Sequence, residues 1–245
     1  MRCGEHGWVA PLIVLVHAPV LGPGSWGPVA AELSRAGGRV VVPSLAGFTD
    51  GGPPYTPRLV GLAAGQVDAG PRDDVVLVTH SGAGVFAPPL LEALAAPGAT
   101  AVFVDAALPS GSAGATVVDP GFLPFLRGLS RDGVVPPWPQ WWPEEDLAPL
   151  FPDEATRRAL TGEARPLPLA FYEETLPPLP EGWPPRRAGY LVFSEPYREQ
   201  ADEAARLGWP VRELPGGHLH MVASPAQVAA AITALATSTR VGAAG

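Results

Sequence analysis

Short apolar runs separated by polar, helix-like segments dominate the first hundred residues. The runs are apolar throughout and do not alternate, which is typical of parallel strands covered by helices on both faces. We expect these strands at residues 12–16, 39–43, 75–78 and 101–104. Between them, helices are predicted at 26–35, 57–67 and from Ser81 to Leu94, the last kinked by Pro88-Pro89. The alternation predicts a doubly wound α/β sheet.

The pattern breaks between residues 108 and 187, where prolines and aromatic residues are dense. Short helices are expected there at 144–150 and 153–163, and the many tryptophans argue against a disordered linker. We therefore predict a mostly helical lid over the carboxyl edge of the sheet. Strand and helix patterns then resume at 189–194, 198–207, 210–214 and 225–235, the last capped by Ser224. Residues 1–107 and 188–245 are thus the expected core, and the tail after Thr237 is expected to fray.

Composition narrows the class of protein. With 245 residues, 47% of them hydrophobic, the chain can bury one sizeable core. A net charge of −8 without a basic run argues against nucleic acid as a partner. The 16 basic residues are all arginine, which excludes Schiff-base lysine chemistry and a P-loop lysine. Cys3 is the single cysteine, and neither a signal peptide nor a membrane span is recognisable, so a soluble cytoplasmic protein is expected.

Ser81 follows the apolar run Val75-Val76-Leu77-Val78-Thr79-His80 and precedes a turn of small residues. A serine at such a strand-to-helix junction is typical of a nucleophile elbow, although Thr79 and Ala83 stand where that motif usually has glycine. A serine hydroxyl needs a neighbouring base. Of the five histidines, His218 follows the last strand and the flexible pair Gly216-Gly217, and it is our predicted base; the others are His6, His17, His80 and His220.

These features together resemble the α/β-hydrolase superfamily. The resemblance rests on His17 after the first strand, Gly24-Ser25-Trp26 opening the next helix, His80-Ser81 at the elbow and Gly217-His218 near the carboxyl end. It covers residues 12–106 and 188–236. It implies the α/β-hydrolase fold, Ser81 as nucleophile and His218 as general base. The motifs are specific for the fold and not for a substrate.

Two carboxylates compete for the role of the acid that orients His218. Most relatives carry an aspartate just after the strand that follows the lid, but here Tyr197 falls at that position and Glu195 lies nearby. Asp105, after the strand that precedes the lid, resembles the site from which some superfamily members supply their acid. We predict Asp105 and keep Glu195 as the alternative.

The oxyanion hole requires two backbone N–H donors. Gly82 supplies one. The second is expected from the loop after the first strand, where Pro19 has no N–H to give, so Val20 is the predicted donor unless it is missing.

The leading functional prediction is a serine hydrolase that cleaves a small-molecule carboxylic ester, lactone or thioester through an acyl-enzyme on Ser81. The alternatives are a lyase or cyclase in which Ser81 and His218 transfer a proton, and a non-catalytic ligand-binding module. No cofactor and no metal are expected, although His218 and His220 have a spacing that suits two metal ligands. An apolar or aromatic substrate is predicted to meet five of the aromatic residues of the lid, Trp138, Trp141, Trp142, Phe171 and Tyr172.

Overall fold

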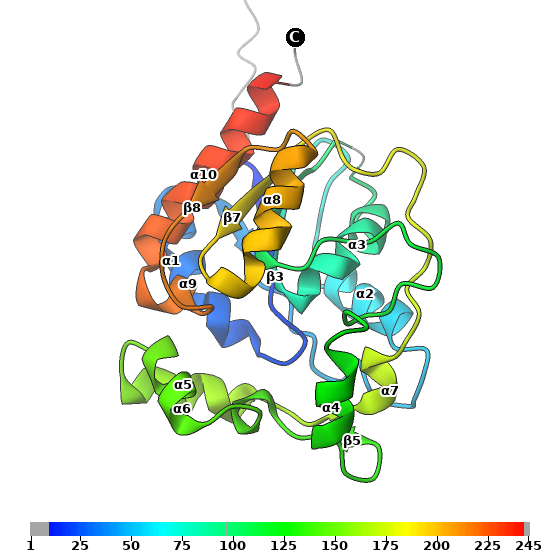
Figure 1. Ribbon diagram of the computed structural model, residues 1–245. Helices are drawn as coiled ribbons and strands as arrows, with labels where there is room; N and C mark the ends of the chain where they lie inside the picture. Colours follow the sequence, from blue (N-terminus) through cyan, green and yellow to red (C-terminus); the bar gives the residue numbers. More distant parts are fainter. Residues whose placement is uncertain (1–9, 97, 243–245) are drawn as a thin grey trace, which may run out of the picture.

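Six parallel strands form a single sheet in the computed structural model, which describes residues 10–96 and 98–242 (Figure 1). The strand order is β2-β1-β3-β4-β7-β8, and every neighbouring pair is parallel. The predicted doubly wound α/β fold is therefore confirmed. The strands are β1 (Leu12–Val16), β2 (Arg39–Val41), β3 (Val75–Ser81), β4 (Thr100–Ala106), β7 (Ala188–Val192) and β8 (Val211–Glu213). Cys3 and His6 lie outside the described residues.

Helices cover both faces of this sheet. On one face, α1 (Gly27–Arg35) and α10 (Pro225–Gly242) pack on alternate strand residues such as Ile13 and Leu15. On the other, α2 (Thr56–Gly65), α3 (Ala87–Ala93) and α8 (Arg198–Arg206) pack on Leu12, Val14 and Val16. Successive residues of a strand point to opposite faces, so a strand buried on both sides is apolar at every position. This accounts for the unbroken apolar runs in the sequence.

Several predicted boundaries differ from the structure. The helix after Ser81 is not one kinked helix, because a 3₁₀ turn, η2 (Gly82–Phe86), comes first and α3 begins directly before Pro88. Proline suits the first turn of a helix, where its missing N–H has no partner to lose. Strand β2 ends at Val41, two residues earlier than expected. Helix α10 continues to Gly242, so the predicted fraying after Thr237 is wrong.

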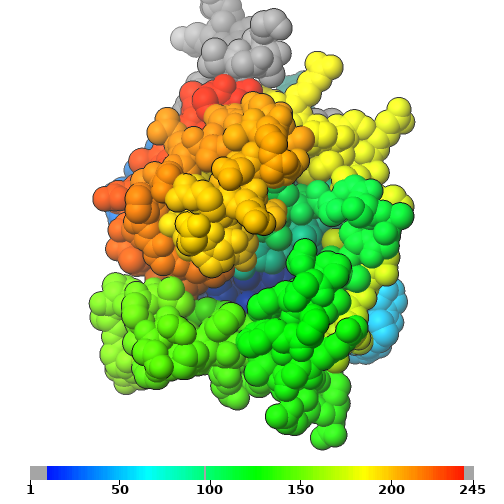
Figure 2. Space-filling view, viewed as in Figure 1, coloured from blue at the N-terminus to red at the C-terminus, as the bar shows by residue number. Residues whose placement is uncertain are grey.

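Residues 108–187, called the insertion below, contribute no strand to the six-stranded sheet. They form short helices and one small antiparallel pair of strands, which the sequence pattern did not predict. In Figure 1 these elements lie as a separate layer along one end of the sheet, and Figure 2 shows them divided from the C-terminal part by a narrow gap with the N-terminal segment behind it. The elements are α4 (Leu123–Leu129), β5 (Val134–Val135), η3 (Trp138–Gln140), α5 (Glu144–Leu147), η4 (Ala148–Leu150), α6 (Glu154–Glu163), β6 (Leu167–Pro168) and α7 (Leu169–Tyr172).

No helix among the described residues is long and apolar enough to cross a membrane.

Candidate active site

Ser81 ends β3 in a backbone conformation that only a strained turn produces. Its φ of 56° and ψ of −132° are rare for a residue with a side chain, and such strain is typical of a nucleophile elbow. The turn is held by Ala107, whose N–H donates to the Ser81 carbonyl at 3.1 Å. A Cβ on Gly84 would collide with the Ala107 carbonyl oxygen. Glycine is therefore required at Gly84, whereas Ala83 fits into the apolar core.

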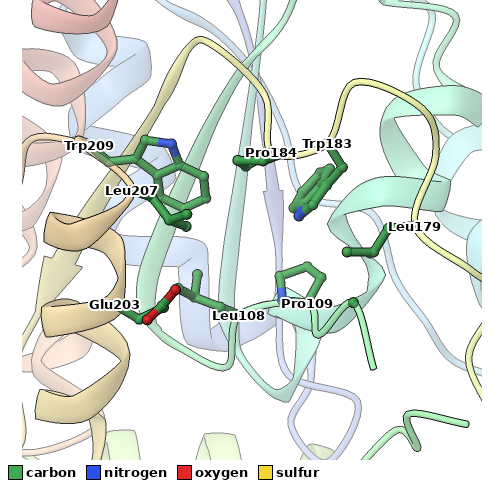
Figure 3. Close-up of a pocket in the computed structure, with 9 residues that line it drawn as sticks. Leu108, Pro109, Leu179, Trp183, Pro184, Glu203, Leu207 and Trp209 are labelled. Atoms are coloured by element: carbon green, nitrogen blue, oxygen red, sulfur yellow. The ribbon is translucent and has the colours of Figure 1, made fainter. Parts of the chain in front are cut away.

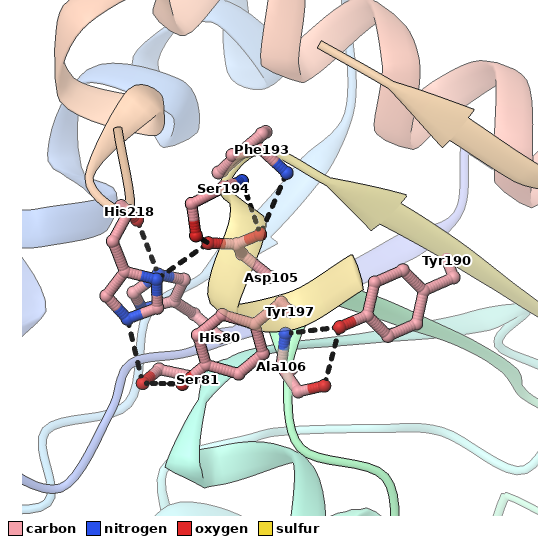
Figure 4. A network of polar contacts seen from close by, with 9 residues as sticks. All are labelled: His80, Ser81, Asp105, Ala106, Tyr190, Phe193, Ser194, Tyr197 and His218. Atoms are coloured by element: carbon pink, nitrogen blue, oxygen red, sulfur yellow. Dashed lines mark hydrogen bonds and ion pairs between the residues drawn. The ribbon is translucent and has the colours of Figure 1, made fainter. Parts of the chain in front are cut away.

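His218 lies beside Ser81, in the loop between β8 and α9 (His220–Ala223) (Figure 4). Its Nε2 is 3.0 Å from the Ser81 Oγ, and its Nδ1 is 2.7 Å from the Asp105 Oδ2. Because a carboxylate only accepts, Nδ1 carries the proton and Nε2 is left to accept from the serine. About 22% of the His218 side chain is exposed, whereas Asp105 is fully buried. These three side chains can pass a proton away from Ser81.

Asp105 is held by more than the histidine. It sits at the end of β4 with φ 43°, a left-handed conformation that aspartate tolerates better than most residues. Oδ1 accepts from the N–H groups of Phe193 and Ser194 at 2.8 and 3.0 Å, and Oδ2 accepts from the Ser194 hydroxyl at 2.6 Å. Burial alone would raise the pKa of Asp105, but the hydrogen bond and charge of His218, with these donors, outweigh burial and hold that pKa below its usual value.

Glu195, the alternative acid, does not reach the histidine. Its side chain is 88% exposed, and the partner recorded for it is Arg198, 3.9 Å away. Of the two candidate carboxylates, the structure brings only Asp105 to His218.

The other described histidines have different positions. His80 is buried under His218: its Nε2 donates to the His218 carbonyl at 3.0 Å, and the two rings lie 4.6 Å apart. Burial, reinforced by the neighbouring His218, lowers the pKa of His80 to about 3. His17 is also buried, which lowers its pKa to about 4, and it links Ala18 and Leu45. His220 packs on the Phe193 ring and contacts neither Ser81 nor Asp105. No group of three potential metal ligands occurs among residues 10–96 and 98–242.

Tyr197 is a member of this cluster that the sequence analysis gave no role. Its hydroxyl is 3.1 Å from the Ser81 Oγ, and its ring stacks on His218 with the centroids 4.9 Å apart and the planes 4° apart. The sequence feature that could have indicated a role for Tyr197 is its position, because it falls where the acid is expected from the family resemblance. Tyr190, also unpredicted, supports the strand end, because its hydroxyl accepts from the Ala106 N–H and donates to the Ala106 carbonyl.

The loop after β1 folds into a tight turn near the predicted second oxyanion donor. The Leu21 N–H donates to the Ala18 carbonyl at 2.9 Å, which makes Pro19 and Val20 the two central residues of a β-turn. The turn bond uses neither central N–H, and Pro19 has none. Val20 is thus the central residue whose N–H the turn leaves free, whereas Gly82 follows Ser81 at the start of η2.

Three contacts bring the insertion up to the loops that carry these residues. The Leu150 side chain lies so close to Gly217 that a Cβ there would touch it, and Gly217 precedes His218. The Glu163 carboxylate accepts from the Gly24 N–H at 3.0 Å, in the 3₁₀ helix η1 (Pro23–Trp26) that follows the loop after β1. Phe171 stacks on Phe86 of η2, with ring centroids 6.2 Å apart. The insertion therefore contacts segments next to the candidate site at three points.

The five aromatic residues predicted to meet the substrate differ in exposure. Trp138, Phe171 and Tyr172 are buried, and Phe171 packs against Phe48 at 4.8 Å. Trp141 is partly buried, and its indole N–H donates to the Pro136 carbonyl at 2.7 Å. Trp142 is 38% exposed. Only Trp141 and Trp142 keep surface that another molecule can reach.

A separate cavity of about 200 Å³ opens beside α8 (Figure 3). Leu108, Trp183, Leu207 and Trp209 line it, and Ser81, Asp105 and His218 do not. This cavity is not part of the candidate active site.

Comparison with known proteins identifies the family. The sequence model described as "Alpha/beta hydrolase family" matches residues 13–231. The chain belongs to the alpha/beta hydrolase family. The resemblance drawn from the sequence is thereby confirmed. A search of curated proteins found no match.

Solved structures of this family share its fold at low sequence identity. An extracellular alpha/beta-hydrolase from a Paenibacillus species, with homology to tobacco salicylic acid binding protein 2, is 21% identical (TM-score 0.66; 90% of this chain and 96% of the other covered). Polyneuridine aldehyde esterase is 19% identical (TM-score 0.68; 93% and 99%). Tomato methylketone synthase I is also 19% identical (TM-score 0.71; 95% and 100%). The chain spans nearly the whole of each.

Proposed function

We propose that this alpha/beta hydrolase is a serine hydrolase that cleaves a small-molecule carboxylic ester, lactone or thioester through an acyl-enzyme on Ser81. The observation that carries the proposal is the continuous contact from the Ser81 Oγ to His218 at 3.0 Å and on to Asp105 at 2.7 Å. The strained φ of Ser81 adds to it, since a strained turn that projects a hydroxyl towards a base is the arrangement nucleophilic catalysis needs.

In the acylation step, the Ser81 Oγ bonds to the carbonyl carbon while its proton moves to the His218 Nε2. The carbonyl electron pair moves onto its oxygen, which the Gly82 and Val20 N–H groups are proposed to stabilise. Asp105 stabilises the imidazolium and holds its tautomer. Collapse of the intermediate breaks the bond to the leaving group, which takes the proton from Nε2.

Water completes the cycle. It attacks the acyl carbon while His218 takes one of its protons, and that proton returns to the Ser81 Oγ as the acid product leaves. Regeneration of free Ser81 makes the reaction catalytic.

The insertion is proposed to act as a lid that selects apolar or aromatic substrates. Its contacts with Gly217, Gly24 and Phe86 support this role, because Gly217 precedes His218 and Phe86 belongs to the 3₁₀ turn that follows Ser81. Among the five aromatic residues predicted to meet the substrate, Trp141 and Trp142 are the proposed first contacts, since both retain exposed surface. The esterase among the similar structures is consistent with the proposed cleavage of an ester.

A second candidate keeps the same residues but omits hydrolysis. Pro19 removes one backbone donor from the loop after β1, and a lyase or cyclase that only transfers a proton has less need of a two-donor oxyanion hole. Ser81 and His218 would then shuttle the proton. A methylketone synthase with the same fold makes this alternative chemically reasonable for the family.

A fluorophosphonate probe separates the two candidates. An activated serine attacks phosphorus, so the wild-type protein should be labelled on Ser81, whereas Ser81→Ala and His218→Ala should not be. The same proteins should be assayed with activated aryl esters of increasing acyl length. Ser112→Ala, a serine in the insertion, is the matched control and should label like the wild type. A folded wild-type protein that takes up no label contradicts the hydrolase proposal.

A further inference from the structure

Tyr197 contacts the reacting atom of the site, yet the mechanism above gives it no task. Its hydroxyl is 3.1 Å from the Ser81 Oγ, beside the His218 Nε2, which is 3.0 Å from the same atom (Figure 4). Its ring is parallel to the imidazole within 4°. Ser81 therefore has two polar partners, of which only one is the base.

The segment that holds Tyr197 also holds Asp105. Tyr197 ends η5 (Glu195–Tyr197), and its N–H donates to the Ser194 carbonyl at 3.2 Å. Ser194 in turn donates its N–H and its hydroxyl to the Asp105 carboxylate, at 3.0 and 2.6 Å. The hydroxyl of Tyr197 is thus fixed relative to the triad by the same short turn that anchors the acid.

The direction of the hydrogen bonds follows from the carboxylate. Asp105 can only accept, so the His218 Nδ1 donates to it and Nε2 accepts the Ser81 proton. The Ser81 oxygen then offers a lone pair, and Tyr197 donates to it. Burial raises the pKa of Tyr197 to about 12, so the phenol keeps its proton near neutral pH and acts as a donor.

We propose that Tyr197 is a catalytic residue of this site: its hydroxyl donates a hydrogen bond to the oxyanion that forms on the substrate carbonyl, and it adds a donor beside the Gly82 and Val20 N–H groups where Pro19 has no N–H to offer. This inference rests on the proposed serine hydrolase function. In the acylation step, the Ser81 proton goes to His218, the bond between Oγ and the carbonyl carbon forms, and the carbonyl electron pair moves onto oxygen. Tyr197 keeps its own proton throughout.

The oxyanion is a better acceptor for Tyr197 than the leaving group. Once Oγ bonds to the acyl carbon it becomes an ester oxygen, a weak acceptor, and the carbonyl oxygen on the same carbon carries the new negative charge. Oγ and the carbonyl oxygen are bonded to the same carbon in the intermediate, so a donor in contact with Oγ also lies near that oxygen. The leaving-group oxygen is already served by the protonated Nε2 of His218. A charged acceptor attracts the Tyr197 hydroxyl more strongly than either neutral oxygen.

The test compares Tyr197→Phe with the wild type. The substitution removes one hydroxyl and keeps the stacked ring, and Tyr55→Phe, at the N-cap of α2 with its ring against Phe171, is the matched control. With an activated ester, kcat and kcat/KM of Tyr197→Phe should fall together by roughly 10²–10³-fold while KM stays within about threefold, as expected for a lost oxyanion donor. Tyr55→Phe should leave both constants unchanged. Circular dichroism and thermal melting check that both variants fold.

A thionoester substrate identifies the atom that receives the hydrogen bond. Sulfur is a weaker acceptor than oxygen, so replacing C=O by C=S should slow the wild type more than Tyr197→Phe. An equal slowing in both proteins overturns the assignment to the oxyanion. A Tyr197→Phe variant as fast as the wild type, or faster, also overturns it, because the hydroxyl would then only hold Ser81 in its resting state. Failure of the hydrolase proposal has a different signature, which is turnover that survives Ser81→Ala.

Discussion

Replacing Asp105 with asparagine should inactivate the enzyme without unfolding it. The carboxylate accepts four hydrogen bonds, from the Phe193 and Ser194 N–H groups, the Ser194 hydroxyl and the His218 Nδ1–H. An asparagine can keep its oxygen at the Oδ1 position, where both backbone donors point. Its NH₂ group then takes the place of Oδ2 and faces Ser194 and His218. The Ser194 hydroxyl can rotate and accept, so the fold retains most of these bonds.

The imidazole cannot adapt without losing its function. With an NH₂ group opposite Nδ1, His218 must accept there and carry its proton on Nε2, which faces the Ser81 Oγ. Two donors then meet, and the serine proton has no acceptor. The wrong tautomer costs on the order of 10⁴ in kcat, or about 5 kcal/mol in the barrier. The loss of charge-assisted bonds costs about 1–3 kcal/mol in the free energy of unfolding.

The assay is the kcat of ester hydrolysis for Asp105→Asn, with urea unfolding of the same protein. Glu195→Gln is the matched control, because that side chain is 88% exposed and its ion pair with Arg198 spans 3.9 Å. It should change kcat by less than about twofold, as surface pairs contribute little. A folded Asp105→Asn protein that keeps a tenth of the wild-type kcat would refute the assignment. So would a large loss in Glu195→Gln.

Three further predictions concern stability. Burial lowers the pKa of His80 from 6.5 to about 3, so His80 stays neutral in the folded protein and becomes protonated below pH 6.5 in the unfolded protein. This residue should therefore lower the free energy of unfolding by about 1.4 kcal/mol for each pH unit between pH 6 and 4. Urea unfolding at a series of pH values should show that the dependence of this free energy on pH is smaller by that amount in His80→Gln. Gly84→Ala forces a Cβ onto the Ala107 carbonyl oxygen and should lower the free energy of unfolding by about 3 kcal/mol or more, measured by chemical denaturation. Gly61→Ala, in open space within α2, is the control and should raise the same free energy by about 0.5–1 kcal/mol. Equal effects of the two substitutions would contradict the packing argument. Glu174→Gln should cost about 1 kcal/mol, read as a lower melting temperature, because the Glu174 carboxylate accepts the two N–H groups that open α2, at 2.5 and 2.7 Å; an unchanged melting temperature would show that this contact contributes nothing.

The strands of the sheet could be predicted from the sequence because each strand is a short run of consecutive apolar residues. Strand β1 is apolar at every position from Leu12 to Val16, as expected of a strand buried on both faces, and the core of β3 has the same pattern. Boundaries were harder where proline was involved. The sequence predicts a kink at Pro88 within a helix, but Pro88 lies in the first turn of α3, a distinction that depends on where the preceding 3₁₀ turn ends.

Contacts within the site could be predicted only in part. The order of Ser81, Asp105 and His218 along the chain is fixed by the family resemblance, but the choice between Asp105 and Glu195 depends on how far β4 and the turn after β7 reach. The stacking of Tyr197 on His218 joins residues 21 positions apart through two loops, and no local pattern encodes it. The packing of the insertion on Gly217 is likewise a tertiary contact that no local sequence pattern predicts.

Two features of this chain differ from the pattern expected for its family, and they are related: the acid lies at the end of β4, and Tyr197 stands where the acid is expected. A carboxylate at the end of β4 reaches the His218 Nδ1 at 2.7 Å, so the turn after β7 no longer has to supply an acid. That turn still has to end beside the histidine, since Ser194 anchors it to Asp105 by two hydrogen bonds. A side chain placed three residues later must therefore lie against the imidazole and the Ser81 Oγ. Tyrosine suits this place because its ring covers the histidine and its hydroxyl gives a proton donor to the reacting oxygen. The loop opposite carries Pro19, which has no N–H, so in the proposed mechanism the Tyr197 phenol adds an oxyanion donor beside the Gly82 and Val20 N–H groups.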